Sequence, residues 1–282
     1  MKKTALCLLL LCAIACAAAS HVMPVRSNGT VPVWLVAAPF PSELPLMAGK
    51  PCTGFATDYL TALGGESQAI PKEGDVVATA DGQKITWQPI FSDSTGIISF
   101  IDVVPKNQAE TGVAYAFCTI NAPEPQRLIF KVGSNDAVRI WVNQTLVHDH
   151  HIHRTLRAGE DTVPVQLNKG DNRVLVKIDQ VGGSWGFIVA MEDEKGRPQS
   201  ALKSSILLAQ PFRTGIYAAK LQPTPLLYRT GSGQKQKAII EVISIGLKNV
   251  VCRLSSPEWK EPLQVKLGDI AAGRMYRDLY VP

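Results

Sequence analysis

The densest group of metal-ligating residue types lies at residues 148–154, which read HDHHIHR. On a strand, successive side chains point to opposite faces, so His148 and His150 share one face and the other two histidines share the opposite face. Two imidazoles on one face can converge on a single zinc or copper ion. A closed site needs a third or fourth ligand, and Asp149 points the wrong way on a regular strand. The run therefore predicts a weak zinc or copper site at His148 and His150, with a solvated hairpin or loop as the alternative.

A second chemistry, sugar binding, needs an exposed aromatic face that stacks on the pyranose ring beside planar polar groups that bind its hydroxyls. Trp185, in a Gly-rich loop before a predicted strand, is the best single candidate, although the same position suits a core tryptophan that closes one end of a β-sandwich. Trp141 is either exposed or packed under the amino-terminal strand. The full set of predicted ligand-binding residues is Trp185, Asn135, Asp136, Arg154, Asp58, Tyr59 and Trp141.

Several of these candidates also have structural interpretations. Asn135 and Asp136 stand between two predicted strands, where an Asn-Asp pair usually forms a turn; a loop contact or a structural calcium ligand is the alternative. Asp58 and Tyr59 fit structural and binding roles equally well. A binding site is favoured because several of these residues could converge on one end of the fold.

No arrangement of residues in the sequence predicts a catalytic site. The acidic clusters, at residues 160–161 and 192–194, fall in predicted turns, where solvated charge is the default role. The sequence has no Gly-x-Ser-x-Gly elbow, no phosphate-binding loop and no His-Glu-x-x-His motif. The sequence therefore leaves open whether the chain is an enzyme, and it predicts no cofactor beyond the calcium and the zinc or copper alternatives.

The segments that must position these residues alternate between apolar and polar side chains. Such alternation with a period of two, interrupted by Gly-, Asn- and Asp-rich turns, is typical of an antiparallel β-sandwich or jelly roll. Strands are predicted at residues 113–118, 128–132, 138–142, 163–167, 174–178 and 187–191. A short helix is predicted at residues 57–63. The polar sides of two strands, which carry Arg139 and Lys177, should face outward or lie beneath a neighbouring element.

Length and composition agree with a folded chain of about two domains. At roughly 150 residues per domain, 282 residues allow about two domains. A content of 46% hydrophobic and 19% charged residues excludes a disordered chain. The net charge of +5, or 5 − 2 = +3 once Lys2 and Lys3 leave with a leader, is too small for a nucleic-acid-binding protein.

The charged break at residues 192–198 is the predicted domain boundary. Beyond it, strand patterns at residues 238–245, 250–254 and 263–267 resemble the opening strands of an immunoglobulin-like sandwich. About 60 residues of strand pattern remain, fewer than the roughly 100 that such a domain uses. The shortfall favours the front end of a longer chain over a small complete domain.

Residues 1–19 have the layout of a secretory signal, with a basic start, an apolar run and then small residues. Cleavage before Ser20 would give a secreted or periplasmic protein. Lipid attachment at Cys16 is the alternative; it would give an outer-membrane lipoprotein, the one case in which we expect contact with a membrane. No later stretch reaches the about 18 continuous apolar residues that a membrane helix needs.

The cysteines predict neither a disulfide framework nor a thiol site. Three of the six lie in the leader, which leaves Cys52, Cys118 and Cys252 at wide spacing. Because none of these belongs to a Cys-x-x-Cys pair, zinc-thiolate and redox sites are poor interpretations. We expect three small buried hydrophobic residues with at most one bridge.

Three stretches of the sequence resemble a known module. They are residues 34–66, which contain Trp34 and a Gly-Gly pair, residues 133–143 (GSNDAVRIWVN) and residues 167–187, which contain a Lys-Gly-Asp-Asn turn. Together they resemble the galactose-binding-like, carbohydrate-binding-module-like β-sandwich of exported bacterial glycoside hydrolases. Modules of this type precede the catalytic domain in some α-mannosidase-like enzymes of glycoside hydrolase family 38, where an immunoglobulin-like linker domain follows. Gln144 follows Asn143 where the family has Asn-Gly, which implies a different turn, since glycine accepts positive φ at little cost.

The resemblance implies an all-β chain with two parts. A galactose-binding-like jelly-roll sandwich is expected at residues 31–196, followed by a partial or small immunoglobulin-like β-sandwich at residues 200–282. The implied function is that of an exported, non-catalytic carbohydrate-associated module, the amino-terminal part of a glycoside hydrolase, which binds glycan or braces the catalytic domain. The expected partners are a glycan or polysaccharide and that catalytic domain. The alternative is a structural or protein-interaction β-sandwich without sugar affinity, which docks through an outward Trp141 surface.

Overall fold

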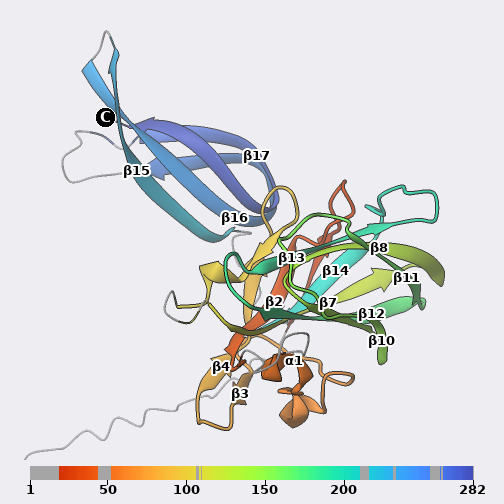
Figure 1. The fold of residues 1–282 in the computed structure, drawn as a ribbon. Coiled ribbons are helices and arrows are strands. Elements are labelled where there is room, and N and C mark those ends of the chain that lie inside the picture. The colour runs from red at the N-terminus through yellow and green to blue at the C-terminus, as the bar shows by residue number, and fades with distance from the viewer. Residues whose placement is uncertain are drawn as a thin grey trace, which may run out of the picture.

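The computed structural model describes residues 19–43, 52–105, 108, 110–209, 216–230, 233–254, 261 and 263–281. The chain is all-β, with a two-sheet sandwich followed by a three-stranded sheet, as predicted for its fold class (Figure 1). The predicted leader, with the lipidation candidate Cys16, lies outside the described residues apart from Ala19. None of the described helices is both long and apolar enough to cross a membrane.

The larger sheet of the sandwich has eight strands. Its main path runs β1 (Ala19–Pro24), β14 (Lys203–Leu208), β7 (Gly112–Ala122), β12 (Gly170–Gln180), β9 (Val138–Val142) and β10 (Thr145–His150). Off this path, β2 (Val33–Phe40) pairs with β7, and β5 (Gln88–Phe91) pairs with β2. All of these pairs are antiparallel, which agrees with the hairpin-rich sequence.

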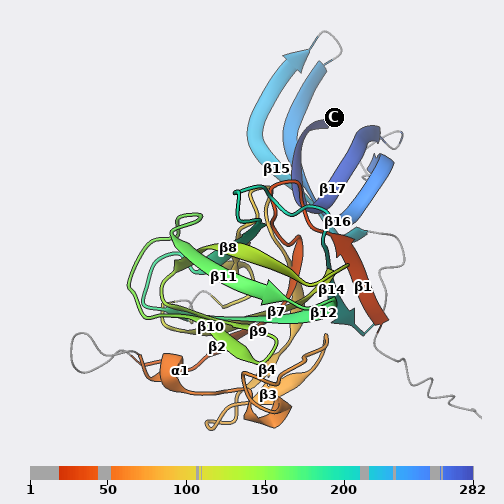
Figure 2. The ribbon, with the colours of Figure 1, turned by 90° about the vertical axis from the view of Figure 1, so that its right-hand side faces the viewer.

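The smaller sheet packs against the larger one and completes the sandwich (Figure 2). Its order is β11 (Asp161–Leu167), β8 (Gln126–Asn135), β13 (Gly186–Glu192) and β6 (Ile98–Ser99). In β11, buried and more exposed residues alternate along the strand, because one face of the strand is turned to the core and the other to solvent. Ring contacts tie the core together, such as the edge-to-face pair Trp34 and Phe187 at 5.2 Å.

Short elements cover the outer face of the larger sheet. They are α1 (Thr53–Ala56), the 3-10 helix η1 (Thr61–Leu63) and the hairpin of β3 (Val76–Ala78) and β4 (Lys84–Thr86), whereas the 3-10 helix η2 (Phe100–Asp102) directly follows β6 of the smaller sheet. The helix predicted at residues 57–63 was therefore wrong: α1 ends at Ala56 and only a single 3-10 turn follows. The α1 segment lies over β12 and β9, since the Arg139 guanidinium donates to the Phe55 carbonyl at 2.7 Å. Consequently Arg139 and Lys177 lie beneath a neighbouring element, the second of the two outcomes that the strand pattern left open.

The hairpin between β9 and β10 shows how the chain turns without the expected glycine. Asn143 itself adopts the left-handed conformation, with φ of 55°. Its side chain is held at both ends, because Oδ1 accepts a hydrogen bond from the Arg173 N–H at 3.1 Å and Nδ2 donates to Asn172 Oδ1 at 3.1 Å. Asparagine tolerates this conformation better than most residues, so Gln144 can follow it.

The sandwich extends beyond the predicted limits of residues 31–196. β1 precedes residue 31, and β14 follows residue 200, yet both belong to the larger sheet. The charged segment at residues 192–198, predicted to be a domain boundary, forms a tight turn within the sandwich instead. Asp193 stabilises that turn by accepting hydrogen bonds from the N–H groups of Lys195 and Arg197, both at 2.9 Å.

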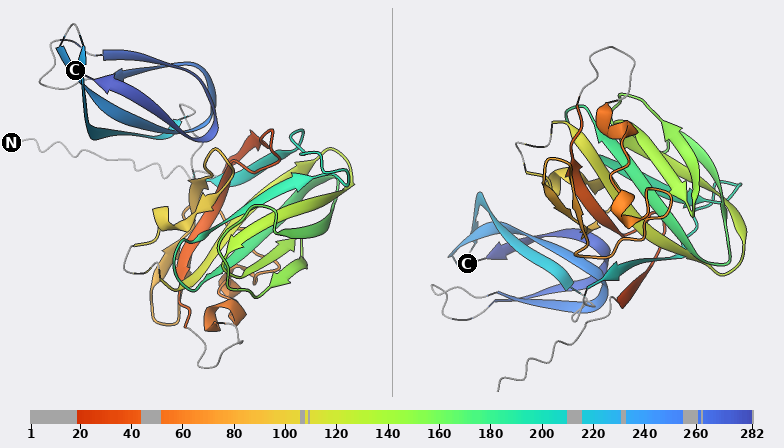
Figure 3. Two further views of the ribbon diagram at one scale, coloured as in Figure 1. Left: turned by 45° about the horizontal axis from the view of Figure 1, so that its top comes forward. Right: turned by 90° about the horizontal axis from the view of Figure 1, so that it is seen from below.

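Beyond β14, the described chain forms a three-stranded antiparallel sheet next to one end of the sandwich (Figure 3). Its strands are β15 (Ile216–Thr230), β16 (Gly233–Leu254) and β17 (Leu263–Val281). The strands predicted at residues 238–245 and 250–254 are parts of the single long strand β16, which carries irregularities in its pairing with β17 between residues 247 and 251. A small apolar cluster of Ile240, Val242, Leu267, Ile270 and Leu279 packs this sheet.

Candidate functional site

Both tryptophans predicted to contact sugar are buried. Trp185 is 1% exposed and packs edge-to-face on Phe100, with ring centroids 5.6 Å apart. Trp141, near the end of β9, is 6% exposed. Neither ring can stack on a ligand, so the core interpretation of Trp185 is the one that holds, and Trp141 offers no outward docking surface. A Gly-rich loop before a strand is equally compatible with an exposed and a buried indole, which is why the sequence could not decide.

Asp58 and Tyr59 stabilise the segment that covers the larger sheet. Asp58 accepts hydrogen bonds from the N–H groups of Leu60 at 2.8 Å and Glu66 at 3.1 Å. Tyr59 stacks on Phe40 at 5.0 Å, and its hydroxyl donates to the Pro41 carbonyl. Of the two roles that the sequence allowed, the geometry supports the structural one for both residues.

Asn135 and Asp136 are also buried and hold the loops at one end of the sandwich. The two carboxylate oxygens of Asp136 accept hydrogen bonds from the N–H groups of Arg154 at 2.8 Å and Val181 at 2.9 Å. Asn135 donates from Nδ2 to Ser184 Oγ at 3.2 Å. Because backbone donors engage both oxygens of Asp136, this carboxylate acts as a loop anchor, and the geometry gives the calcium interpretation no support.

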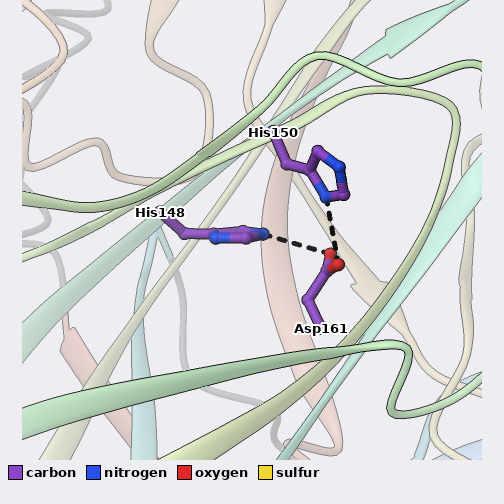
Figure 4. A group of neighbouring side chains, drawn as sticks. All are labelled: His148, His150 and Asp161. Atoms are coloured by element: carbon purple, nitrogen blue, oxygen red, sulfur yellow. Dashed lines mark hydrogen bonds and ion pairs between the residues drawn. The ribbon is translucent and has the colours of Figure 1, made fainter.

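The structure brings the predicted His148 and His150 together around one carboxylate, Asp161 (Figure 4), and the predicted Arg154 binds the same carboxylate. We call these four residues the Asp161 cluster. His148 Nε2 lies 3.1 Å from Asp161 Oδ2, and His150 Nδ1 lies 3.0 Å from Oδ1. Arg154 forms a two-pronged ion pair with the same carboxylate, at 3.0 and 2.6 Å. The two histidines come from β10 and Asp161 from β11, so the cluster joins the edges of the two sheets.

The electrostatics of the Asp161 cluster favour an ionised carboxylate. Burial alone would raise the pKa of Asp161, but hydrogen bonds from Arg154 and His148, together with the Arg154 charge, outweigh burial and hold that pKa well below its usual range. The sequence placed Asp161 in a solvated turn and missed its role. A contact between edge strands of opposite sheets leaves no local pattern from which it could have been found.

A second buried network, centred on Lys177, lies under α1 and was also missed. Lys177 Nζ donates to the Thr57 carbonyl and to Glu66 Oε1, both at 2.7 Å, and the Tyr115 hydroxyl donates to the same Glu66 oxygen at 2.6 Å. Burial lowers the pKa of Lys177 despite the nearby Glu66 charge, and burial raises the pKa of Tyr115. Two oxygen acceptors from the covering segment bind the Lys177 ammonium, so the network fastens that segment to the sheet.

Asp179, on the same strand as Lys177, is buried with an incomplete set of partners. Its Oδ1 accepts a hydrogen bond from Ser42 Oγ at 3.0 Å, whereas its Oδ2 has no hydrogen-bond partner among the described residues. Burial raises the pKa of Asp179. Burial and the neighbouring Asp179 charge raise the pKa of Cys52 to about 12, which disfavours the thiolate and argues against a nucleophile. Cys52, Cys118 and Cys252 are free thiols; Cys52 and Cys118 are buried as expected, whereas Cys252 is only partly buried because it lies on the three-stranded sheet outside the sandwich core.

Asp179→Asn should stabilise the protein at neutral and alkaline pH. A carboxyl whose pKa is raised by folding contributes stability below its unfolded pKa, and that contribution is lost as the pH rises through the folded pKa. The amide keeps an oxygen for Ser42 and removes the buried charge, so a gain of about 1 kcal/mol, or roughly 2–4 °C in Tm, is expected at pH 8.

Thermal melting followed by circular dichroism at pH 8 and pH 4 would check this, because the gain should shrink at the lower pH. Asp171→Asn, an exposed position on the same strand, is the matched control and should leave Tm unchanged. An Asp179→Asn protein that melts at or below the wild-type temperature at pH 8 would contradict the interpretation.

A cavity of about 670 Å³, which we call the junction cavity, lies between the β1–β2 connection and β17. It is lined by Pro24, Val25, Arg26, Ser27, Asn28, Ser94, Asp269, Met275, Tyr276 and Arg277. Tyr276 is 50% exposed and gives the cavity an accessible aromatic ring. Beside the cavity, the Arg26 guanidinium packs directly against Gly273, because a Cβ added at Gly273 would lie only 1.7 Å from Arg26 Nη2. Tyr276 could not be predicted as a site residue, because it meets the β1–β2 connection only through tertiary packing, far from it in the sequence.

The fold defines an all-β sandwich protein, and comparison with known proteins adds little. No protein-family profile and no curated protein matches the sequence. Among solved structures, the chain is similar to a GH2 β-galacturonidase from Eisenbergiella tayi, with 13% identity, a TM-score of 0.32 and coverage of 94% of this chain and 37% of that one. The exo-chitosanase CsxA of Amycolatopsis orientalis has 12% identity and a TM-score of 0.32, with coverage of 93% of this chain and 28% of that one. A β-glucuronidase of Bifidobacterium dentium has 10% identity and a TM-score of 0.30, with coverage of 93% of this chain and 42% of that one.

The chain spans less than half the length of each of these three proteins. At such TM-scores the likeness carries no argument about the present chain. The resemblance to modules of family 38 enzymes therefore stays a prediction from the sequence.

Proposed function

We propose that this chain is an exported, non-catalytic carbohydrate-associated module, the amino-terminal part of an α-mannosidase-like glycoside hydrolase, which binds glycan or braces the catalytic domain. The observation that carries the sugar-binding part is the junction cavity. It combines an accessible tyrosine ring with polar side chains in a hollow of about 670 Å³, within the roughly 300–1,000 Å³ usual for ligand sites. Secretion or a periplasmic location is part of the proposal, with lipidation at Cys16 as the alternative.

The polar groups of the junction cavity differ in their capacity to bind hydroxyls. Asn28 is already engaged, since Nδ2 donates to the Thr95 carbonyl at 3.0 Å and Oδ1 accepts from Thr30 Oγ1 at 2.7 Å. Ser94 and Arg277 are exposed at the wall of the cavity. A guanidinium offers a planar pair of donors, the geometry that suits vicinal hydroxyls or a sugar carboxylate. Tyr276 and Arg277 are therefore the residues to which the proposal assigns ligand contact.

The contacts made by carboxylates of the two acidic clusters, at residues 160–161 and 192–194, support a non-catalytic role. Asp161 is committed to the Asp161 cluster, and Glu160 lies 3.5 Å from the Arg154 guanidinium. Asp193 is committed to its own turn and to an ion pair with Arg197 at 2.6 Å. A glycosidase needs two carboxyl groups facing each other across a substrate, one of them able to act as an acid. These carboxylates are instead engaged in structure.

Tyr276→Ala should weaken glycan binding by about tenfold or more if the ring stacks on a sugar, since 1.4 kcal/mol corresponds to a factor of ten in affinity. Binding of the wild-type protein to a broad glycan panel comes first, followed by titration of the best ligand with each variant. Tyr280→Ala is the matched control, because Tyr280 is 47% exposed on the same strand and does not line the cavity. If the two variants bind the glycan equally well, the glycan does not bind in the junction cavity.

The second candidate function is a structural or protein-interaction β-sandwich without sugar affinity. It is favoured by the burial of all four described tryptophans, Trp34, Trp87, Trp141 and Trp185. An exposed apolar pair, Leu226 and Leu227, stands on β15 at 51% and 63% exposure and is a better docking surface than the buried Trp141. If the protein binds none of the glycans on the panel, the result favours this second function.

A further inference from the structure

We propose that His148, His150 and Asp161 form a binding site for one divalent transition-metal ion, with zinc as the reference ion, at the edge where the two sheets of the sandwich meet (Figure 4). The site is independent of the junction cavity and of sugar binding. It supplies two imidazoles and one carboxylate, a donor set that suits zinc and copper and does not suit calcium, which takes oxygen ligands.

The spacing of the three donors is close to what such an ion requires. The donor atoms all lie within 4.8 Å of one another, and each imidazole nitrogen is 3.0 or 3.1 Å from a carboxylate oxygen. In a tetrahedral zinc site with bonds of about 2.0–2.1 Å, neighbouring ligand atoms are about 3.3 Å apart. Only small side-chain movements are needed to place an ion between them.

The backbone places the ligands on strands. His148 and His150 pair across β9 with Ile140 and Val138, and an irregularity between Leu146 and His148 sets the register that brings both rings to Asp161. The rings are 5.7 Å apart and inclined at 74°, so they approach the carboxylate from two directions. The His150 side chain is 38% exposed, so an ion can reach the site from solvent.

The charge balance of the site is compatible with a cation despite Arg154. Asp161 and Glu160 together carry two negative charges near the single guanidinium, which lies 3.5 Å from Glu160. A carboxylate has about four lone-pair positions, and Arg154 engages two of them. Arg154 can stay as the outer partner that orients a ligating carboxylate, with a further hydrogen bond to Ser134 Oγ at 2.8 Å.

Metal binding would replace the imidazole N–H contacts to Asp161. A carboxylate only accepts, so His148 Nε2 and His150 Nδ1 carry the hydrogens in the ion-free state. A neutral imidazole can hold its proton on the other ring nitrogen, which frees these two atoms to bind the ion. Each imidazole thus exchanges a hydrogen bond for a coordinate bond, and no oxidant or reductant is involved.

The test is a titration of the full protein, purified without a polyhistidine tag and stripped with a chelator, with Co²⁺ followed by displacement with Zn²⁺. The expected result is one equivalent of Co²⁺ bound, with visible absorption of a four-coordinate ion and no thiolate charge-transfer band. At a hundredfold excess of Zn²⁺ over Kd, Tm should rise by about 5 °C or more.

His148→Ala and His150→Ala should each weaken Co²⁺ binding at least tenfold. His153→Ala is the matched control and should bind as the wild type does, because His153 is 70% exposed and pairs with Asp136 outside the site. Circular dichroism of each variant separates loss of the site from loss of the fold. A wild-type protein that binds no Co²⁺ and gains no Tm overturns the proposal, as does a thiolate band or an equal loss of binding in His153→Ala.

Discussion

Lys177→Met should lower the stability of the protein by about 3–5 kcal/mol, which corresponds to a fall of roughly 10 °C in Tm. The Lys177 side chain is fully buried, and its ammonium contacts the Thr57 carbonyl and Glu66 at 2.7 Å each. Methionine fills much of the same volume but removes the donor to the Thr57 carbonyl and the cation beside Glu66, whose Oε1 keeps only the hydrogen bond from the Tyr115 hydroxyl. The Glu66 side chain is 12% exposed, so the loss of the lysine leaves a largely desolvated charge without its ion pair, which is what makes the loss of stability large.

Thermal or urea unfolding of the variant measures this effect, and two further variants sharpen it. Lys248→Met removes an ion pair of the same length, 2.7 Å, but with the lysine 83% exposed, and should leave the Tm close to that of the wild type. Adding Glu66→Gln to Lys177→Met should recover part of the loss, because the buried charge is then gone. If Lys177→Met melts within 2 °C of the wild type (~0.5–1 kcal/mol), the network does not fasten the covering segment.

Trp185→Ala should destabilise the protein by a similar amount, about 3–5 kcal/mol, through a cavity in the core. The indole is 1% exposed, contacts Phe100 and lies against Gly112, where an added Cβ would be 3.1 Å from the ring. Glycan affinity, measured well below the melting temperature, should not change, since Trp185 does not line the junction cavity. This variant is thus expected to lose stability and to keep its glycan affinity.

Trp185→Phe is the matched comparison for the cavity argument. The Trp185 Nε1 has no hydrogen-bond partner among the described residues, so the substitution by phenylalanine reduces the side-chain volume without removing a hydrogen bond. Its Tm should fall by much less than that of the alanine variant. A Trp185→Ala protein that keeps its Tm but loses glycan binding would reverse the assignment and return the indole to a ligand site.

Period-two alternation was enough to predict six of the twelve strands of the sandwich. The six predicted strands all lie within β7, β8, β9, β11, β12 and β13, because each of these strands turns one face to the core. The alternation could not show what covers the opposite face. The alternation places Lys177 on the solvent-facing side of its strand. Its partner Glu66 is 111 residues away, so the burial of Lys177 depends on tertiary packing alone.

The candidate sites show the same division. The pairing of His148 and His150 on one face follows from strand geometry, and both rings reach the same carboxylate. Asp161 could not be predicted as their partner, because it belongs to the other sheet. Exposure of an aromatic residue was equally out of reach: Trp185 and Tyr276 differ in what packs against them, which the residues next to them in the chain do not specify.

The pairing of β1 with β14 sets the order in which the sandwich can be completed. The bond from Ser204 Oγ to the Met23 carbonyl closes a loop of 181 residues, one of the slowest kinds of contact to form. In a chain that emerges amino end first, β1 has no partner until Leu208 is available, and the part of β7 opposite β14 stays an open edge. Open edges recruit strands from other molecules, so incomplete chains that stop before β14 are the species most prone to aggregate.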